Sequence, residues 1–145
     1  MTQHIHPTAF IAPDVTLGDN ATVGPFAVIE TGAVLGANCQ IGAHAVVHGH
    51  VKMGDGNILH PHAVLGGLPQ DTGFKPETDS WLIIGDNNVF REGFTAHRAS
   101  KEHAETRIGS GCFFMNNSHV AHDCNVGNNT IFANNVAIGG HVEVG

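Results

Sequence analysis

A repeat of six residues runs through almost the whole chain and limits the folds that it can adopt. An aliphatic residue recurs at every sixth position from Ile5 to Leu65, and the apolar pattern resumes at Ile84 and again from Ile108 to Val144. A period of six does not match an α-helix, whose apolar positions recur at three and four. Six residues suit one short strand and one tight corner, so the repeat predicts a solenoid of short strands.

The other positions of the repeat fit the corners of such a solenoid. Glycine often follows the aliphatic residue, where we expect it to supply the backbone freedom that a corner needs. Proline fits a corner but not the middle of a paired strand. Four prolines stand two positions after the aliphatic residue: Pro7, Pro13, Pro25 and Pro61. The positions of glycine and proline therefore support the same arrangement of strands and corners as the aliphatic positions do.

Three repeats make one triangular coil, and the coils stack as parallel strands about 4.8 Å apart. The predicted fold is all-β, a parallel β-helix whose interior is a column of Ile, Leu and Val with small residues between them. Cys39, Cys112 and Cys124 all occupy the inward position four residues after the aliphatic residue. No two of them are separated by three repeats, which is the length of one coil, so we expect them to stay unpaired.

Two segments interrupt the repeat within what we expect to be a single domain, residues 1–145. The first, at about 68–81, shifts the frame by one residue, and the second, at about 100–106, keeps it. Solenoids tolerate loops at their corners, and such loops often form the binding face. The first loop carries Gln70 and Asp71 in a chain with only 13% charged residues. The alternative is that both insertions have no function.

Composition excludes several classes of protein. A net charge of −7 argues against nucleic-acid binding. No apolar run reaches the roughly 18 residues of a membrane helix, and the N-terminus does not read as a signal peptide. Three cysteines without a pairing pattern suit a reducing compartment, so we expect a cytoplasmic protein.

The segment Asn116–Cys124, read N-N-S-H-V-A-H-D-C, adds chemistry that the repeat does not require. His122 stands two residues after Val120, at a corner, so its ring is expected to project outward and to be exposed. Gly140 lies three repeats later, at the same position of the next coil. The same spacing is expected to stack Asp123 on His141.

This combination suits acyl transfer. An imidazole takes up a proton near neutral pH and can serve as a general base. A glycine lets its backbone N–H approach a developing oxyanion closely. The alternative is that His122 is an ordinary corner residue, as we expect for His44, His48, His50, His60 and His62.

The repeat resembles that of the hexapeptide acyltransferases, whose fold is a left-handed parallel β-helix, and the handedness is implied by this resemblance alone. Within that superfamily, H-V-A-H-D-C followed by N-N-V-A-I-G-G-H-V-E-V resembles the UDP-N-acetylglucosamine O-acyltransferase family of lipid A biosynthesis. That family also carries a Q-D loop, matched by Gln70 and Asp71, and a T-x-H-R segment, matched by Thr95–Arg98.

The resemblance implies the reaction and the role of each matched residue. By the resemblance, His122 would be the general base and Gly140 the oxyanion donor. Apart from the resemblance, Asp123 or another acceptor could hold the His122 ring in the right tautomer, as a carboxylate does elsewhere. The residues implied to lie near the sugar nucleotide and the thioester are Gln70, Asp71, His97, His119 and His141. The implied reaction moves a 3-hydroxyacyl group from acyl carrier protein to the 3-hydroxyl of UDP-N-acetylglucosamine. The resemblance further implies a homotrimer, and neither a cofactor nor a metal.

Departures from the family leave alternatives open. Gly73 and Phe74 stand where the family has a lysine and a tyrosine, and the family continues past the position of Gly145, so we expect a truncated architecture. One alternative is a metalloenzyme of the γ-carbonic anhydrase kind, in which His119, His122 and His141 would bind zinc. Another is an inactive structural β-helix.

A cluster of basic residues suggests where the acidic carrier protein binds. Four of the six basic residues fall within a short stretch: Arg91, Arg98, Lys101 and Arg107. The alternative is that these residues only offset the nearby Glu92, Glu102 and Glu105.

Overall fold

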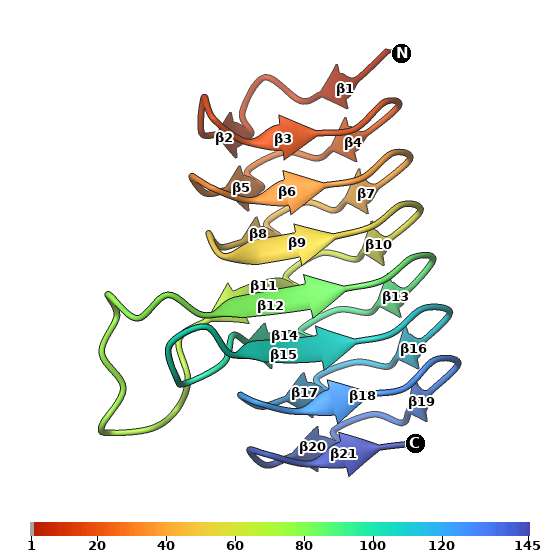
Figure 1. The fold of residues 1–145 in the computed structure, drawn as a ribbon. Helices are drawn as coiled ribbons and strands as arrows, with labels where there is room; N and C mark the ends of the chain where they lie inside the picture. Colours follow the sequence, from red (N-terminus) through yellow and green to blue (C-terminus); the bar gives the residue numbers. More distant parts are fainter. Residues whose placement is uncertain (1) are drawn as a thin grey trace.

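The computed structural model describes residues 2–145 as a left-handed parallel β-helix in which the chain winds in stacked triangular coils (Figure 1). Residues 2–145 contain strands, turns and loops but no helix, so no helix there is suited to cross a membrane. The prediction of an all-β solenoid is therefore confirmed. Each side of the triangle is a parallel sheet of seven strands.

The three sheets follow one another around each coil. Sheet A contains β1 (His4–Ile5), β4 (Thr22–Val23), β7 (Gln40–Ile41), β10 (Ile58–Leu59), β13 (Val89–Phe90), β16 (Phe113–Phe114) and β19 (Ile131–Phe132). Sheet B contains β2 (Phe10–Ile11), β5 (Val28–Ile29), β8 (Val46–Val47), β11 (Val64–Gly67), β14 (Thr95–His97), β17 (His119–Val120) and β20 (Ala137–Ile138). Sheet C contains β3 (Thr16–Leu17), β6 (Val34–Leu35), β9 (Val51–Met53), β12 (Trp81–Ile84), β15 (Glu105–Ile108), β18 (Asn125–Val126) and β21 (Glu143–Val144).

The pairing between strands shows how each insertion changes the spacing of the repeat. In coils without insertions, each residue pairs with the residue three repeats further along the chain, as Ile29 does with Val47. Leu65 pairs with Ala96, so this coil is longer than a regular one by two repeats and one residue, which shifts the frame by one. Ala96 pairs with Val120, so the next coil is longer by one whole repeat, which keeps the frame.

Both insertions leave the solenoid at the corner between sheets B and C. The longer loop, 68–80, connects β11 to β12 and projects far from the stack (Figure 1). The shorter loop, expected at about 100–106, lies at 98–104. Glu105 and Thr106 belong to β15 instead, because they pair with Trp81 and Leu82 of the neighbouring coil.

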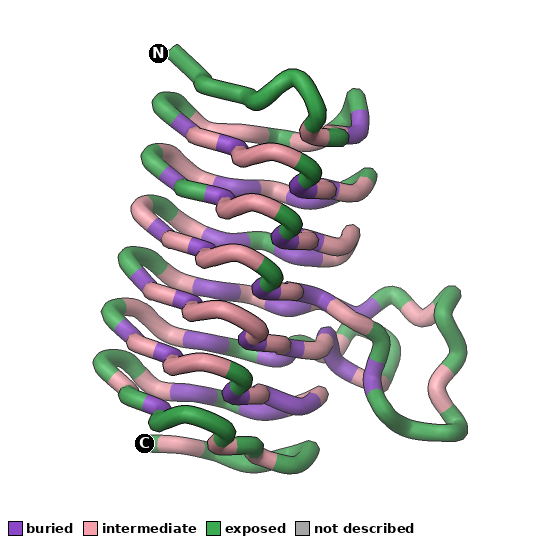
Figure 2. Tube along the Cα trace, turned by 180° about the vertical axis from the view of Figure 1, so that it is seen from behind, coloured by how far each residue is buried: buried purple, intermediate pink, exposed green. Residues whose placement is uncertain are grey.

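The interior is a column of apolar side chains, as predicted, and the buried positions alternate along each coil (Figure 2). Ile29, Leu35 and Val47 are at most 1% exposed. The column is less covered in the end coils, where Ile5 is 44% exposed and Ile138 is partly buried, since an end coil has a neighbour on one side only. In the later coils the column becomes aromatic, with rings 4.8–5.3 Å apart: Phe90, Phe94, Phe114 and Phe132. All three cysteines are buried and free, at the inward position that was expected.

The glycines that follow the aliphatic residues were predicted to supply backbone freedom, which holds for Gly66 with a φ of 87° but is wrong for the others, such as Gly18. A Cβ atom at Gly18 would lie 2.4 Å from the carbonyl carbon of Gly36 in the next coil. These glycines therefore permit close backbone approach between coils. The left-handed conformation occurs two residues later instead, for example at Asn20 and His44, with φ of 60° and 59°. Asparagine and histidine adopt this conformation more readily than most residues.

Candidate active site

The predicted catalytic residues lie at the corner between sheets B and C, below the two loops. His122 and Asp123 occupy the turn between β17 and β18, and Gly140 and His141 the turn between β20 and β21. The His141 N–H donates to the His122 carbonyl at 3.1 Å, so the predicted stacking of these two corners is confirmed. Asp123 and His141 both have φ near 60°, as Asn20 and His44 do at the same position of other repeats, so the backbone of this corner is that of a regular turn.

His122 and Asp123 form a close, largely covered pair. The Nδ1–H of His122 donates to Asp123 Oδ2 at 2.7 Å, because an ionised carboxylate can only accept. This leaves Nε2 of His122 with its lone pair free to accept a proton. The His122 side chain is 15% exposed and that of Asp123 10%, so the expectation of an exposed ring is wrong in extent. Neighbouring turns cover most of both side chains.

Asp123 is held as an anion by hydrogen bonds. Burial alone would raise the pKa of its carboxyl, but hydrogen bonds from Ser100 and His122 outweigh burial and hold the pKa below its usual value. The Ser100 hydroxyl donates to Oδ2 at 2.6 Å, and the Ser100 N–H lies 3.2 Å from the same oxygen. His141 Nε2 lies 3.6 Å from Oδ2.

Ser100 and Thr106 are site residues that the sequence reasoning missed. Thr106 Oγ1 accepts the Asp123 N–H at 2.8 Å. Both residues belong to the coil that is one repeat longer than a regular coil. Counting that extra repeat would have placed Ala99 over Asp123, with Ser100 beside it. The spacing of the repeat therefore contained the information needed to predict Ser100 as a neighbour of Asp123.

The position of the His122 ring depends on the absence of a side chain at Gly140. A Cβ atom at position 140 would lie 2.5 Å from Cε1 and 2.8 Å from Nε2 of His122. The ring therefore lies against the Gly140 backbone, in space that any other residue would occupy. The Gly140 N–H donates no hydrogen bond within residues 2–145.

A second pair of histidines lies beside this one. The rings of His97 and His119 meet edge to face with centroids 4.6 Å apart, and the Thr95 hydroxyl lies 2.7 Å from His119 Nδ1. Burial lowers the pKa of His97 to about 4, helped by the nearby His119, and burial also lowers the pKa of His119. His97 Nδ1 and His119 Nε2 are buried without a partner among the described residues. Both imidazoles are therefore neutral at physiological pH.

Gln70 and Asp71 lie in the long loop and are exposed. Asp71 begins a turn, since its Oδ1 accepts the Gly73 N–H at 2.9 Å and its carbonyl accepts the Phe74 N–H at 2.9 Å. Within residues 2–145 no hydrogen bond joins Gln70 or Asp71 to the His122 corner. The structure thus brings four of the eight predicted site residues into one corner, with two more beside them on sheet B. The four are His122, Asp123, Gly140 and His141, and the two are His97 and His119.

The sequence pattern of the bacterial transferase hexapeptide family (six repeats) matches residues 32–67 and 105–145 of this chain. The chain belongs to this family. Among curated relatives, it is 54% identical over 142 residues to acyl-[acyl-carrier-protein]–UDP-N-acetylglucosamine O-acyltransferase of Aliarcobacter butzleri, covering 97% of this chain and 54% of the relative. It is 40% identical over 144 residues to the protein of the same name from Campylobacter concisus, covering 99% and 55%. The chain spans about half the length of these relatives.

Solved structures agree with the fold. The chain superimposes on UDP-N-acetylglucosamine O-acyltransferase of Moraxella catarrhalis with a TM-score of 0.92 and 35% identity, covering 97% of this chain and 55% of the other. For the UDP-N-acetylglucosamine acyltransferase of Bacteroides fragilis the TM-score is 0.91 and the identity 37%, covering 95% and 54%. These likenesses extend over nearly all of the chain.

This hexapeptide-family chain does not bring the three histidines of the zinc alternative together. In residues 2–145, the one set of three ligand-type side chains whose donor atoms lie within 4.8 Å of one another is His122, Asp123 and His141. His119 is outside that set. Within one chain, the described residues therefore do not form a three-imidazole site of the carbonic anhydrase kind.

The basic cluster expected from the sequence is not a surface patch. Arg98 is only 3% exposed. Arg91 is paired with Glu92 at 3.0 Å, and Arg107 is paired with Glu105, so nearby acids offset both of them. Arg91 follows a strand of sheet A, whereas Arg107 lies on sheet C. The two therefore lie on different parts of the surface.

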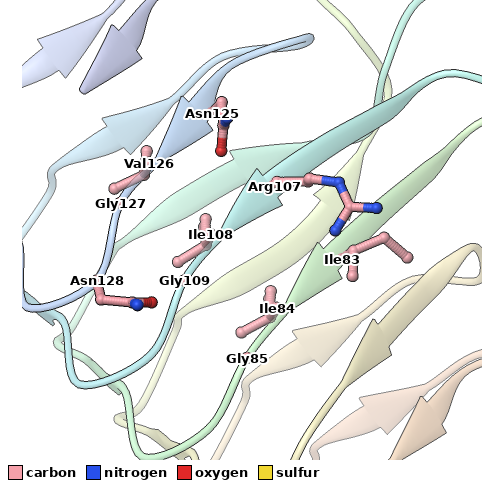
Figure 3. A pocket seen from close by; sticks show the side chains of 10 residues that line it. All are labelled: Ile83, Ile84, Gly85, Arg107, Ile108, Gly109, Asn125, Val126, Gly127 and Asn128. Atoms are coloured by element: carbon pink, nitrogen blue, oxygen red, sulfur yellow. The ribbon is translucent and has the colours of Figure 1, made fainter. Parts of the chain in front are cut away.

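A pocket on the outside of sheet C lies apart from this site. Figure 3 shows its lining, with Ile83, Arg107 and Asn125 from three adjacent strands. None of the predicted site residues lines it. This pocket is therefore separate from the His122 corner.

Proposed function

We propose that this protein is an O-acyltransferase that moves a 3-hydroxyacyl group from acyl carrier protein to the 3-hydroxyl of UDP-N-acetylglucosamine, the first step of lipid A biosynthesis. The names of its relatives support the donor and the acceptor. The observation that carries the proposal is the hydrogen bond from His122 Nδ1 to Asp123 Oδ2. It fixes the tautomer in which Nε2 is the base.

The reaction follows from that tautomer. Nε2 of His122 removes the proton from the sugar hydroxyl as its oxygen attacks the thioester carbonyl carbon. The carbonyl oxygen becomes an oxyanion, and the unpaired Gly140 N–H is the donor that would stabilise it. When the tetrahedral intermediate collapses, the carbon–sulfur bond breaks. The proton on Nε2 then passes to the leaving sulfur, which regenerates neutral His122 and frees the carrier thiol.

Asp123 holds the ring and offsets the positive charge that His122 gains in the transition state, as a carboxylate does in other histidine-based sites. Ser100 in turn fixes the carboxylate. We assign His97, His119, His141, Gln70 and Asp71 to the surroundings of the sugar nucleotide and the thioester. The neutral state of His97 and His119 suits hydrogen bonding to uncharged groups of the sugar.

The proposal includes a homotrimer in the cytoplasm. A narrow solenoid has a small core for its length, and association would cover apolar side chains that face outward. Phe10 is 59% exposed on sheet B and Ile131 is 67% exposed on sheet A. Three buried free cysteines suit a reducing compartment. Light scattering that found a monomer at micromolar concentration would count against the trimer.

The test is an acyl-transfer assay of the protein with 3-hydroxyacyl carrier protein and UDP-N-acetylglucosamine. The expected product is the 3-O-acylated sugar nucleotide, formed together with the free carrier thiol. Hydrolysis of the thioester without transfer, or no consumption of it, would contradict the proposal.

A further inference from the structure

Arg98 is the one charged side chain among the buried residues of the described chain, and it is 3% exposed. No carboxylate lies within ion-pair distance of it in residues 2–145. Burying an unpaired charge is costly unless other groups hydrogen-bond to it. The groups that hydrogen-bond to Arg98 therefore indicate its structural role.

Backbone carbonyls of the long loop take the place of a carboxylate. The guanidinium Nη1–H donates to the Thr78 carbonyl at 2.7 Å and to the Ser80 carbonyl at 3.3 Å. Nη2–H donates to the Pro76 carbonyl at 2.7 Å. The Phe74 ring covers the other side, with Cζ 5.2 Å from the ring centroid, within cation–π range. Every one of these partners belongs to the loop 68–80.

The backbone of Arg98 also sits where the loop leaves and returns. The Arg98 N–H donates to the Gly67 carbonyl at 3.1 Å, at the end of β11. The next residue, Ala99, donates to the Trp81 carbonyl at 3.4 Å, at the start of β12. The guanidinium therefore binds the second half of a loop whose two ends are tied to the same segment.

These contacts reach the predicted sugar-nucleotide residues on one side and the catalytic pair on the other. Phe74, which packs on the guanidinium, donates its N–H to the Asp71 carbonyl at 2.9 Å. On the other side, His97 precedes Arg98, and Ser100 binds the Asp123 carboxylate. Segment 97–100 thus joins the loop to the His122 corner.

We infer that Arg98 is a positioning residue that sets the loop carrying Gln70 and Asp71 at a fixed place relative to the His122–Asp123 pair, and so determines the affinity for the sugar-nucleotide acceptor. This inference rests on the proposed function. Arginine suits the task because its planar fork reaches several carbonyls at once and stacks on an aromatic ring. A lysine at this position would supply a single ammonium and no planar face.

The test compares Arg98→Met with Arg91→Met, which removes a half-exposed arginine that is paired with Glu92 at another corner. Two readouts need no catalysis. Chymotrypsin cleavage after Phe74, identified by mass, reports on loop mobility, and the emission of Trp81, the one tryptophan in the chain, reports on the base of the loop. Trp81 is suited to this because its indole N–H donates to Asp79 at 3.1 Å within the loop.

In Arg98→Met we expect faster cleavage after Phe74 and red-shifted Trp81 emission. The KM for UDP-N-acetylglucosamine should rise about 10- to 100-fold, the effect of losing one or two hydrogen bonds to a charged group. The kcat and the KM for the acyl carrier protein should change much less, because the His122–Asp123 pair keeps Ser100. Arg91→Met should match the parental protein in every readout.

Unchanged cleavage and emission in a folded Arg98→Met would overturn the inference, as would a loosened loop with an unchanged acceptor KM. If Arg98→Met does not fold, Arg98→Lys decides by the same readouts, with smaller changes expected in the same direction. If the parental protein neither binds nor acylates UDP-N-acetylglucosamine, the proposed function fails and the positioning role fails with it. The cleavage and emission data then still show separately whether Arg98 anchors the loop.

Discussion

The imidazole of His122 occupies the space that a side chain at position 140 would fill. A Cβ atom on Gly140 would lie 2.5 Å from His122 Cε1, closer than real Cβ contacts come. The glycine in the next coil is therefore a condition for the ring position that the Asp123 hydrogen bond requires. The site therefore depends on the His122 side chain of one coil and on the Gly140 backbone of the next.

Gly140→Ala should displace the His122 ring and lower turnover by about 10- to 100-fold, a fraction of what general base catalysis contributes. Stability should change little, because the corner is near the end of the described stack. Steady-state kinetics and thermal unfolding measure the two effects. Gly139→Ala is the matched control, since a Cβ atom there would meet nothing within 4 Å. Equal losses in both variants would contradict a specific role for the space at position 140.

Asp123→Asn keeps the shape of the carboxylate and tolerates the φ of 61°. It removes the charge that holds Nδ1 of His122 protonated. The ring can then adopt the other tautomer, in which the proton is on Nε2. We expect kcat to fall by roughly 10²–10⁴-fold with a smaller change in KM. Ser100→Ala should have a weaker effect in the same direction, because the Ser100 N–H still reaches the carboxylate. A wild-type kcat in Asp123→Asn would exclude the proposed tautomer control.

The stability of the protein should decrease as the pH falls from about 6.5 to about 4. His97 has a pKa of about 4 in the folded state and about 6.5 when unfolded. Between these values the unfolded chain binds a proton that the folded chain does not, which favours unfolding. The lowered pKa of His119 acts in the same direction. Urea unfolding at several pH values measures the slope, and His97→Gln should make it shallower; an unchanged slope would contradict this assignment.

Asn88→Ala should lower the free energy of unfolding by about 2–4 kcal/mol, since it leaves several buried polar groups without partners. The Asn88 amide N–H groups donate to Asn57 Oδ1 at 3.0 Å and to the Gly109 carbonyl at 2.9 Å, and its Oδ1 accepts the Cys112 N–H at 2.8 Å. Urea denaturation gives the value. Asn125→Ala, at an exposed strand position, should stay within about 0.5 kcal/mol of the parental protein. Equal stability of the two variants would show that the buried asparagines are dispensable.

The regular coils were predictable because a period of six fixes which residues stack. Ile29 over Val47 and His122 over Gly140 both follow from a spacing of three repeats. The loop contacts did not follow, because a loop has no period. The Arg98 side chain bonds to carbonyls, which every residue has, so nothing in the sequence marks its partners. The sequence thus predicted the fold and the His122 corner, but not the contacts of the long loop. Ser100, which fixes Asp123, could have been placed only by counting the extra repeat of its coil.

The central claim is that His122 is the general base of acyl transfer to the sugar hydroxyl, and the turnover of His122→Ala tests it most directly. The matched control is His60→Ala, a half-exposed corner histidine between sheets A and B. His122→Ala should lower kcat by about 10²–10⁴-fold with a much smaller change in KM, while His60→Ala stays near the parental value. A kcat for His122→Ala comparable to that of the parental protein would remove this residue from the mechanism.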